Sequence, residues 1–425
     1  MANIKRLIWI YFWLLLFEGA LRKWLVPSLD TVLLLVRDPI VVVIYLLAMQ
    51  RGVFPRNGFI MVGVLLAFLC VVFTIFAECP VVVGVFGMRV NFLHVPLVFV
   101  IGRVFDRSDV IKIGRWLLLI SVPMAALIVY QFRSPQDAWI NKGAFNTHYD
   151  TVRPSATFPF VTGTAIFLAF VAAFLAYSFI QKGRYPLWLR MAALPAVMGS
   201  MAVSGSRLAV MSVAVVVAAA VGATVVRGKG VGGVLAACLA IGAAFLVLQH
   251  TSFYKEGQGQ LDQRFVDANP DQTNQTAFVT SRLTGDAGAA FEIMERTPLF
   301  GNGSGLGTSV GAQLTMGQRV FLGAEGEWGR LIWESGALLG GALILFRCWL
   351  AGIVGWKSLQ ALLAGEFLPI LLLSSCIVNL IQGQWGVTNV QGFACFQAGL
   401  ALAACRSPKV SSKTTIAEPL PAVTT

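Results

Sequence analysis

The chain has 425 residues, of which 57% are hydrophobic and only 12% are charged, and its mean hydropathy is +0.76. These values exclude a soluble globular protein and indicate an integral membrane protein. The formal charge of +12 would favour nucleic-acid binding in a soluble protein, but in a membrane protein the placement of the cations is more informative than their sum.

Apolar stretches of spanning length recur along the whole chain. A helix needs about 20 apolar residues to cross a hydrocarbon core of about 30 Å. The sequence therefore predicts an all-α polytopic membrane protein with about 12 transmembrane helices, at residues 7–26, 31–49, 58–77, 84–102, 116–132, 158–180, 186–203, 207–226, 230–248, 329–350, 361–381 and 386–404. The first stretch carries Glu18 and lacks a small-residue cleavage site, so we expect a retained anchor rather than a cleaved signal.

The basic residues of alternate short loops give an orientation. With a cytoplasmic N-terminus, cations such as Arg51, Arg103, Arg184 and Arg227 fall on the cytoplasmic side, as the positive-inside rule requires. We therefore predict a multi-pass protein of the bacterial inner (cytoplasmic) membrane with both termini in the cytoplasm. Residues 406–425 are polar and lack aromatic side chains, which predicts a disordered cytoplasmic tail.

A second set of cations falls on the outer face, where topogenesis disfavours them. It comprises Arg22, Lys23, Arg89, Arg133, Arg153, Arg207, Arg264, Arg282, Arg296, Arg319 and Arg330. Each could pair with an outer-loop carboxylate, such as Glu78 or Asp262, or reach the lipid headgroups. For the whole set we favour an anionic ligand, because the planar fork of arginine suits the oxygens of phosphate and diphosphate.

The predicted spans divide the chain into four parts. Residues 1–248 hold helices one to nine, residues 249–328 form a long periplasmic loop, residues 329–405 hold helices ten to twelve, and the tail follows. Loops of that length are usually functional. Within it, residues 281–297 place Ala287, Phe291 and Met294 near helical spacing, which predicts a short amphipathic surface helix that ends before Pro298.

Several classes of site are not supported by the sequence. The seven cysteines show no C-x-x-C spacing and the three histidines are scattered, so we expect no metal site, no disulfide framework and no cofactor. The glycine run "PLFGNGSGLGTSVG", residues 298–311, lacks the lysine of a P-loop. It also misses the dinucleotide spacing, because Leu306 follows Gly301 and Gly303 where a third glycine is required. We therefore expect neither a nucleotide nor a nucleic-acid partner, and interpret the run as a flexible turn or as a backbone cradle for another phosphate.

Charged residues also enter the predicted spans. In "GAEGEWGRLIWESGALLGG", residues 323–341, Glu327, Arg330 and Glu334 share one helix face. A surface pair on such a face contributes only a few tenths of a kcal/mol, whereas ionisable groups at membrane depth are functional candidates. Four other segments bring Arg22, Arg89, Arg153 and Arg207 to the outer ends of spans, in "FEGALRKWLVP", "GMRVNFLHVP", "HYDTVRPSATFPF" and "VSGSRLAV".

These motifs carry a resemblance. The sequence resembles the O-antigen ligase and O-antigen polymerase superfamily of bacterial membrane glycosyltransferases. The resemblance rests on "RPSATFPF", on "SGSR" opening a helix, on "SRL" with "ERTPLFGNGSG", and on the E-x-G-x-x-x-G of residues 334–340. The likeness covers about residues 150 to 341. It implies metal-independent transfer of a glycan, at the periplasmic face of the lipid bilayer, from an undecaprenyl-diphosphate-linked donor to a glycan or lipid-glycan acceptor. It also implies that Arg153, Arg207 and Arg282 hold the diphosphate and stabilise its developing charge. As further substrate-binding candidates we take Arg22, Arg89, Arg330, Gly301 and Gly303.

One departure from the family pattern affects the predicted chemistry. Ligases of the family carry a His-Asn pair nine residues ahead of the glutamate of E-x-G, and here those positions hold Glu325 and Gly326. A carboxylate, Glu325 or Glu327, would then act as the general base on the acceptor hydroxyl. The departure favours a polymerase or exopolysaccharide-type enzyme over lipid A core ligation.

Two other functions remain open from the sequence. A transporter or flippase for a lipid-linked or anionic solute would bury cations along a central path and show repeat symmetry between its halves; the sequence shows no such repeat, and its informative cations cluster at one face. A structural partner of a polysaccharide export complex would not need the arginines at all.

Overall fold

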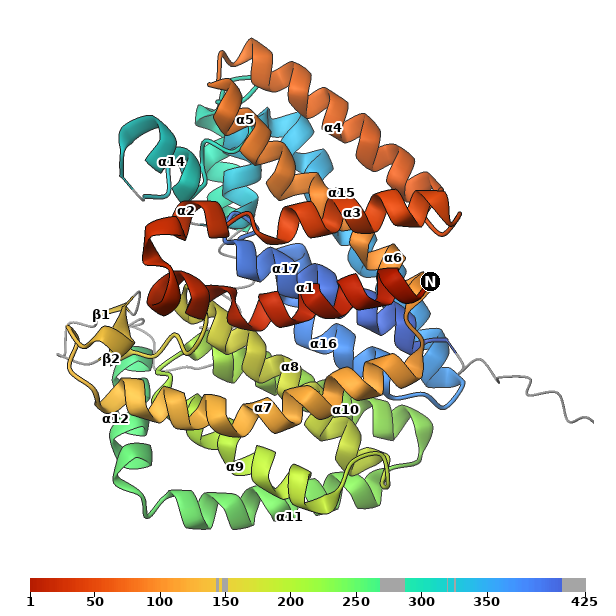
Figure 1. The fold of residues 1–425 in the computed structure, drawn as a ribbon, viewed down its shortest axis with the longest axis vertical. Helices are drawn as coiled ribbons and strands as arrows, with labels where there is room; N and C mark the ends of the chain where they lie inside the picture. Colours follow the sequence, from red (N-terminus) through yellow and green to blue (C-terminus); the bar gives the residue numbers. More distant parts are fainter. Residues whose placement is uncertain (143–144, 147–151, 268–286, 319, 325, 407–425) are drawn as a thin grey trace, which may run out of the picture.

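The computed structural model describes residues 1–142, 145–146, 152–267, 287–318, 320–324 and 326–406. In this part of the chain the structure is almost entirely helical, and the predicted all-α class is confirmed (Figure 1). The strands found there are β1 (Phe145–Asn146) and β2 (Val152–Arg153), which pair antiparallel with Phe145 opposite Arg153.

Helices lie at every predicted span. They are α1 (Ala2–Ala20), α2 (Asp30–Leu33), α3 (Arg37–Gln50), α4 (Gly58–Phe76), α5 (Val81–Met88), α6 (Val95–Val104), α7 (Arg107–Arg133), α8 (Val161–Ile180), α9 (Leu187–Val203), α10 (Arg207–Arg227), α11 (Val231–Leu248), α12 (Ser252–Asp267), α14 (Ser309–Met316), α15 (Glu327–Leu363), α16 (Leu368–Ile381) and α17 (Thr388–Ala404). Short π-helical turns at Leu21–Leu25 and Arg89–Leu93 extend α1 and join α5 to α6.

Not all of these helices meet the requirements for crossing a membrane. In the described part of the chain, seven helical stretches are both long and apolar enough: α4, α5 with α6, α7, α8, α10, α11 and α15. Helices α9 and α16 are apolar but shorter. The chain is therefore a multi-pass membrane protein, while the full count of twelve crossings stays a prediction.

The long predicted loop is partly helical in the structure. It contains α12 and α14, and residues 287–296 form a further helix that ends before Pro298. Phe291 on this helix is exposed while Ala290 is buried. The amphipathic segment is thus confirmed as helical from residue 287, whereas its first part, with Arg282, lies outside the described residues, as does the tail beyond Arg406.

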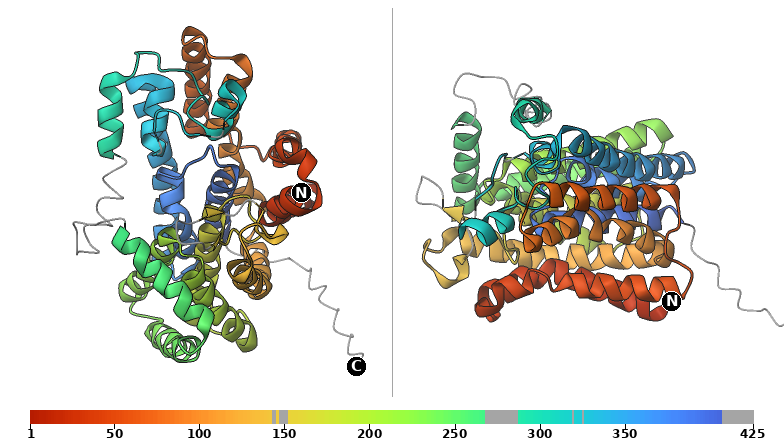
Figure 2. Two further views of the ribbon diagram at one scale, coloured as in Figure 1. Left: turned by 90° about the vertical axis from the view of Figure 1, so that its left-hand side faces the viewer. Right: turned by 90° about the horizontal axis from the view of Figure 1, so that it is seen from above.

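The bundle has two distinct ends. At the first, Lys5 near the start of α1 pairs with Asp106 (3.3 Å), and Arg406 beyond α17 donates to the Gly102 carbonyl (3.2 Å). The opposite end carries β1, β2, α12 and α14 (Figure 1), and we call it the hairpin end. The left-hand view of Figure 2 looks at this end of the molecule.

Helices α8, α10 and α17 begin at the hairpin end, and the part of α15 after its break at Gly336 runs in the same direction. At their starts, Gly163 of α8 lies directly against the Asn389 side chain of α17. At their far ends, Arg227 of α10 donates to the Leu363 carbonyl of α15 (2.7 Å), and Cys405 beyond α17 donates to the Lys357 carbonyl of α15 (3.5 Å). The connection after α10 likewise packs on the last residues of α8. The free N–H groups and positive dipole ends of α8, α10 and α17 therefore face the hairpin end.

The core of the molecule is α8. It packs against α9, α10, α11, α16 and α17, and nearly all of its residues are buried, whereas α4, which is more apolar still, has few buried residues. Phe158 and Phe170 hold it to Phe393 of α17, with ring centroids 5.7 and 6.3 Å apart. A helix that is apolar on every side fits either protein or lipid, so only packing distinguishes the two.

A break in α15 determines where the glycine run lies. Gly336 has non-helical angles, φ 77° and ψ 167°, so the carbonyls just before it accept hydrogen bonds from outside the helix. Trp333 O accepts from the Asn302 N–H (3.0 Å), and Glu334 O accepts from the Gly303 N–H (2.9 Å). An unsatisfied carbonyl in a membrane costs several kcal/mol, so the glycine run stabilises the break.

The glycines are required by both conformation and space. Gly301, Gly303 and Gly305 all have positive φ, which L side chains rarely adopt. A Cβ on Gly301 would collide with the Glu334 carbonyl, and one on Gly336 would collide with the Leu299 carbonyl. The run forms a turn, as the first of the two interpretations predicted, but the turn is closely packed rather than flexible.

This packing is testable with two glycines of similar backbone angle. Gly301 has φ +71° and no free space, whereas Gly317 has φ +73° and nothing within 4 Å of an added Cβ. Both alanine substitutions should lose about 1–2 kcal/mol for the left-handed conformation, and Gly301→Ala about 1–3 kcal/mol more for the collision. The thermal unfolding midpoints of the two detergent-purified variants measure the difference; equal midpoints would contradict the close packing.

Candidate functional site

The segment 152–160, "VRPSATFPF", is held rigidly at the hairpin end. Lys23 donates to Ser155 Oγ (2.9 Å) and to the Ala156 carbonyl (2.6 Å). Gln131 of α7 accepts the Ala156 N–H (2.8 Å) and donates to the same carbonyl (3.3 Å). Ala156 has a φ of 51°, which is strained for a residue with a side chain. Such strain persists only where the surroundings enforce it, and it is typical of functional loops.

The remainder of this segment is anchored by three further helices. Thr157 donates to the Leu16 carbonyl of α1 (2.6 Å), and the buried Phe158 ring packs on Phe167 of α8 and Phe393 of α17. Arg153, the second residue of this segment, ends β2 and is half-buried. The sequence reasoning did not identify Gln131, whose signal is one amide side chain inside an otherwise apolar span.

Arg207 is the first residue of α10, as predicted. The preceding turn is made of buried residues: Ser204 Oγ accepts the Ser206 N–H, and the Ser206 side chain caps the helix by accepting the Ala209 N–H, both at 3.3 Å. Gly205 between them has a φ of 52°. The Arg207 side chain is half-buried and lies at the positive N-terminus of its helix.

The predicted shared face of Glu327, Arg330 and Glu334 is confirmed as a buried ion-pair cluster. Arg330 donates to Glu327 (2.7 and 2.9 Å) and to Glu334 (2.7 Å). Arg347, further along α15, contacts Glu327 (2.6 Å) and stacks on the Trp385 ring at 3.8 Å. All four charged side chains are at most 4% exposed. Two carboxylates balance two guanidiniums, so the cluster has no net charge.

The cluster extends beyond α15. Arg330 also donates to Asn91 Oδ1 (3.2 Å) in the π-helical turn, and Glu334 Oε1 accepts the Gly307 N–H (3.0 Å) from the glycine run. Sequence reasoning did not include Arg347, although an arginine within an apolar stretch was a visible signal. The cluster ties three segments together at the start of α15.

Two more outer cations are paired near the start of the chain. Arg22 contacts Glu18 (3.3 Å) and Asp30 (2.7 Å), and Glu18 also binds Arg37 (2.6 Å). Arg89 donates to both oxygens of Asp38 (2.5 and 3.1 Å). The pairing considered as the alternative to an anionic ligand is therefore present for these two residues and for Arg330. Their partners are carboxylates within or beside the helices, not the outer-loop carboxylates named from the sequence.

The predicted site residues thus fall into three groups. Arg22, Arg89 and Arg330 are buried and neutralised, so an anion would have to compete with their carboxylates. Arg153 and Arg207 are half-buried at the hairpin end. Arg282 and Glu325 lie outside the described residues.

The glycines of the predicted phosphate cradle require a correction. The Gly301 N–H donates to the Pro298 carbonyl (2.9 Å) and the Gly303 N–H to the Glu334 carbonyl. Both donors are used inside the protein, because the broken helix needs them, and they are not presented to a phosphate.

Side chains suited to a metal are not grouped in the structure. Within the described ranges, no set of three or more His, Cys, Asp or Glu side chains is placed to hold a metal ion, and the cysteines are free.

Removing the central cation of the buried cluster should destabilise the protein strongly. Arg330→Met leaves Glu327 and Glu334 under-compensated, which costs about 3–5 kcal/mol for a buried pair. The matched control is Arg296→Met, because Arg296 forms an exposed pair with Glu292 (3.5 Å) that contributes at most about 1 kcal/mol. Thermal unfolding in detergent measures both. An Arg330→Met variant as stable as the control would show that the cluster is not structural.

Comparisons with known proteins do not assign this chain to a family. The resemblance drawn from the sequence therefore depends on its short motifs, and the activity it implies is a proposal. No protein-family model, no curated protein and no solved structure matches this chain.

Proposed function

We propose that this protein is a periplasm-facing, metal-independent glycosyltransferase of the polysaccharide polymerase or ligase type. Its donor would be an undecaprenyl-diphosphate-linked glycan and its acceptor a second glycan or lipid-glycan, in the bacterial inner membrane. One observation carries the proposal: α8, α10 and α17 begin at the hairpin end, which also holds Arg153, Arg207 as the first residue of α10, and the strained Ala156 fixed by Lys23 and Gln131.

This arrangement suits a diphosphate leaving group. Helix N-termini attract anions through their free N–H groups and dipoles, and arginine forms paired hydrogen bonds to phosphate oxygens. Fixed donors that face developing negative charge lower the barrier without reorganising during the reaction. Arg207 is placed at the start of α10 by a buried turn, and Arg282 is proposed as a third cation from the motif alone.

The transfer itself needs one base. The acceptor hydroxyl attacks the anomeric carbon and forms the new glycosidic C–O bond, while the bond to the diphosphate oxygen breaks and its electron pair leaves with the diphosphate. The hydroxyl proton passes to a carboxylate. Glu327 is buried between Arg330 and Arg347, a geometry that favours a structural role, so we assign the base to Glu325. A single displacement of this kind inverts the anomeric configuration.

The second candidate is a transporter or flippase for a lipid-linked or anionic solute. The broken helix α15 and its buried charges favour it, because discontinuous helices form the substrate sites of many transporters. The glycosyltransferase remains the preferred proposal because Arg153 and Arg207 both lie at the hairpin end of the bundle, which also holds the strained Ala156.

The diphosphate site can be tested by removing its cations. Arg207→Ala, Arg153→Ala and Arg282→Ala should each lower turnover about 100-fold or more, as loss of a charge-stabilising donor does. Arg184→Ala serves as the control, because this exposed residue lies in the connection between α8 and α9, away from the hairpin end. Purified protein is reconstituted with a lipid-diphosphate oligosaccharide, and product size is followed without added metal.

The products of that assay separate the candidates. A ladder of lengthening glycans indicates a polymerase, and a single addition to the acceptor indicates a ligase. Movement of the intact donor across the vesicle membrane without any transfer would support the flippase. Full activity in both Arg207→Ala and Arg282→Ala would refute the diphosphate clamp.

The two glutamates should respond differently to neutralisation. Glu325→Gln should reduce kcat about 100-fold to 10,000-fold, the usual contribution of a general base, with an unchanged unfolding midpoint. Glu327→Gln should lower the unfolding midpoint, because it leaves two buried guanidiniums under-compensated. Turnover and thermal unfolding of both variants are compared; the reverse pattern would assign the base to Glu327.

A further inference from the structure

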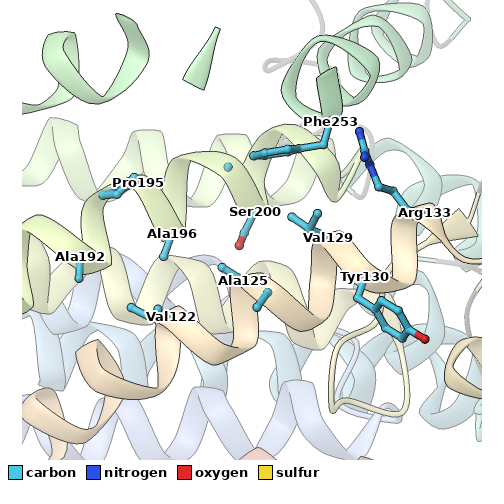
Figure 3. Close-up of a pocket in the computed structure, with 12 residues that line it drawn as sticks. Val122, Ala125, Val129, Tyr130, Arg133, Ala192, Pro195, Ala196, Ser200 and Phe253 are labelled. Atoms are coloured by element: carbon cyan, nitrogen blue, oxygen red, sulfur yellow. The ribbon is translucent and has the colours of Figure 1, made fainter. Parts of the chain in front are cut away.

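A groove of about 590 Å³ lies between α7 and α9 (Figure 3). Its volume is within the usual range for small-ligand sites. It is open along one side, and its lining is almost wholly apolar, with Val122, Ala125 and Val129 from α7 and Ala192, Ala196 and Gly199 from α9.

Small side chains create this groove. Along α9, Ala192, Ala196 and Ser200 recur every four residues and face Ala125 of α7. Side chains of this size leave the space between the two helices unfilled, although the helices pack against each other. Phe253 of α12 closes one end of the groove. The result is an apolar groove that is open to the side.

The groove has a cation at its hairpin end. Arg133, the last residue of α7, lies there beside Phe253 (Figure 3). Its guanidinium donates to Ser252 Oγ (2.5 Å) and lies 3.8 Å from Glu256. The Arg133 side chain is 48% exposed, so it keeps open surface for another anion. Charge and apolar lining together fit a hydrocarbon chain with a phosphate at one end.

The groove also adjoins the proposed diphosphate site from two sides. On α7, Gln131 lies two residues before Arg133 and fixes Ala156. On α9, Ser200 lies just before the turn that leads to Arg207. A chain in the groove would therefore end between the segment with Arg153 and the start of α10.

We propose that this groove binds the polyisoprenyl chain of the lipid-linked donor, with the phosphate next to the lipid at Arg133. The inference rests on the proposed function and names where its donor is held. The polyisoprenyl carrier has one hydrocarbon chain and a phosphate at its end, which matches one apolar groove with one cation, whereas a bulk phospholipid presents two acyl chains. Annular phospholipid is therefore the occupant that the test must exclude.

The experiment measures lipid binding directly. The full chain is purified in detergent and titrated with a C55 polyprenyl phosphate, with phosphatidylglycerol as the two-chain comparison, and bound lipid is counted by native mass spectrometry. Ala196→Trp fills the groove, and Val225→Trp on α10 is its control, since Val225 is 74% exposed and lies outside the groove. Arg133→Ala removes the cation, with Arg184→Ala as its control.

The expected result is selective loss. Ala196→Trp should weaken polyprenyl phosphate binding about tenfold or more, because displaced CH₂ groups lose their burial. Arg133→Ala should weaken it by a similar factor, since it removes a charged hydrogen bond. Both controls should bind like the unmodified chain. If Ala196→Trp unfolds, a photoreactive polyprenyl phosphate replaces it, and crosslinks to α7 and α9 in the unmodified chain are expected.

Two results overturn the proposal: unchanged binding in Ala196→Trp, or equal competition by phosphatidylglycerol. Crosslinks confined to other helices would also overturn it.

Failure of the proposed function is distinguishable from failure of the groove. Selective carrier binding in the groove without any glycan transfer would reject the enzyme and keep the groove, whereas normal transfer by Ala196→Trp would reject the groove and keep the enzyme.

Discussion

The Arg330 guanidinium, held between two buried glutamates, is the interaction on which the hairpin-end half of α15 depends. In a low-dielectric interior each of these charges would be very costly alone, so Glu327, Arg330, Glu334 and Arg347 have to be assembled together. The cluster fixes the start of α15, and the break at Gly336 then leaves carbonyls that the glycine run must satisfy. The ion pairs that neutralise the buried charges and the hydrogen bonds that satisfy the free carbonyls therefore lie at the same place, the first turns of α15.

The buried ion pairs also divide the cations by role. Arg22, Arg37 and Arg89 are neutralised by carboxylates of the first helices, which holds α1, α3 and the π-helical turn at Arg89–Leu93 together. A guanidinium used in this way is a structural element. The half-buried cations Arg153 and Arg207 lie instead at the hairpin end, where α8, α10 and α17 begin and add the positive ends of their dipoles.

The hairpin end and the apolar groove share helix α7. Segment 152–160 is held by α1, α7, α8 and α17, and the same α7 carries one wall of the apolar groove. The lipid-linked donor that we propose has two parts with opposite needs: its hydrocarbon chain requires apolar surroundings, and its phosphates require polar or charged ones. A groove that ends at Arg133, beside a rigid polar segment, meets both requirements.

The sequence by itself determined the helices and the local faces. Runs of apolar residues located α4, α7, α8 and α10, because a helix in lipid must be apolar along its length. The spacing of Glu327, Arg330 and Glu334 determined their shared face, because residues three and four apart lie on the same side of a helix. Only the tertiary structure decided the distant partners, such as Arg89 with Asp38 and Gln131 with Ala156. It also decided that the N–H groups of Gly301 and Gly303 stabilise neighbouring backbone rather than face a phosphate. These choices depend on which helices pack together, and apolar helices carry little local signal of their neighbours because protein and lipid are equally apolar surroundings.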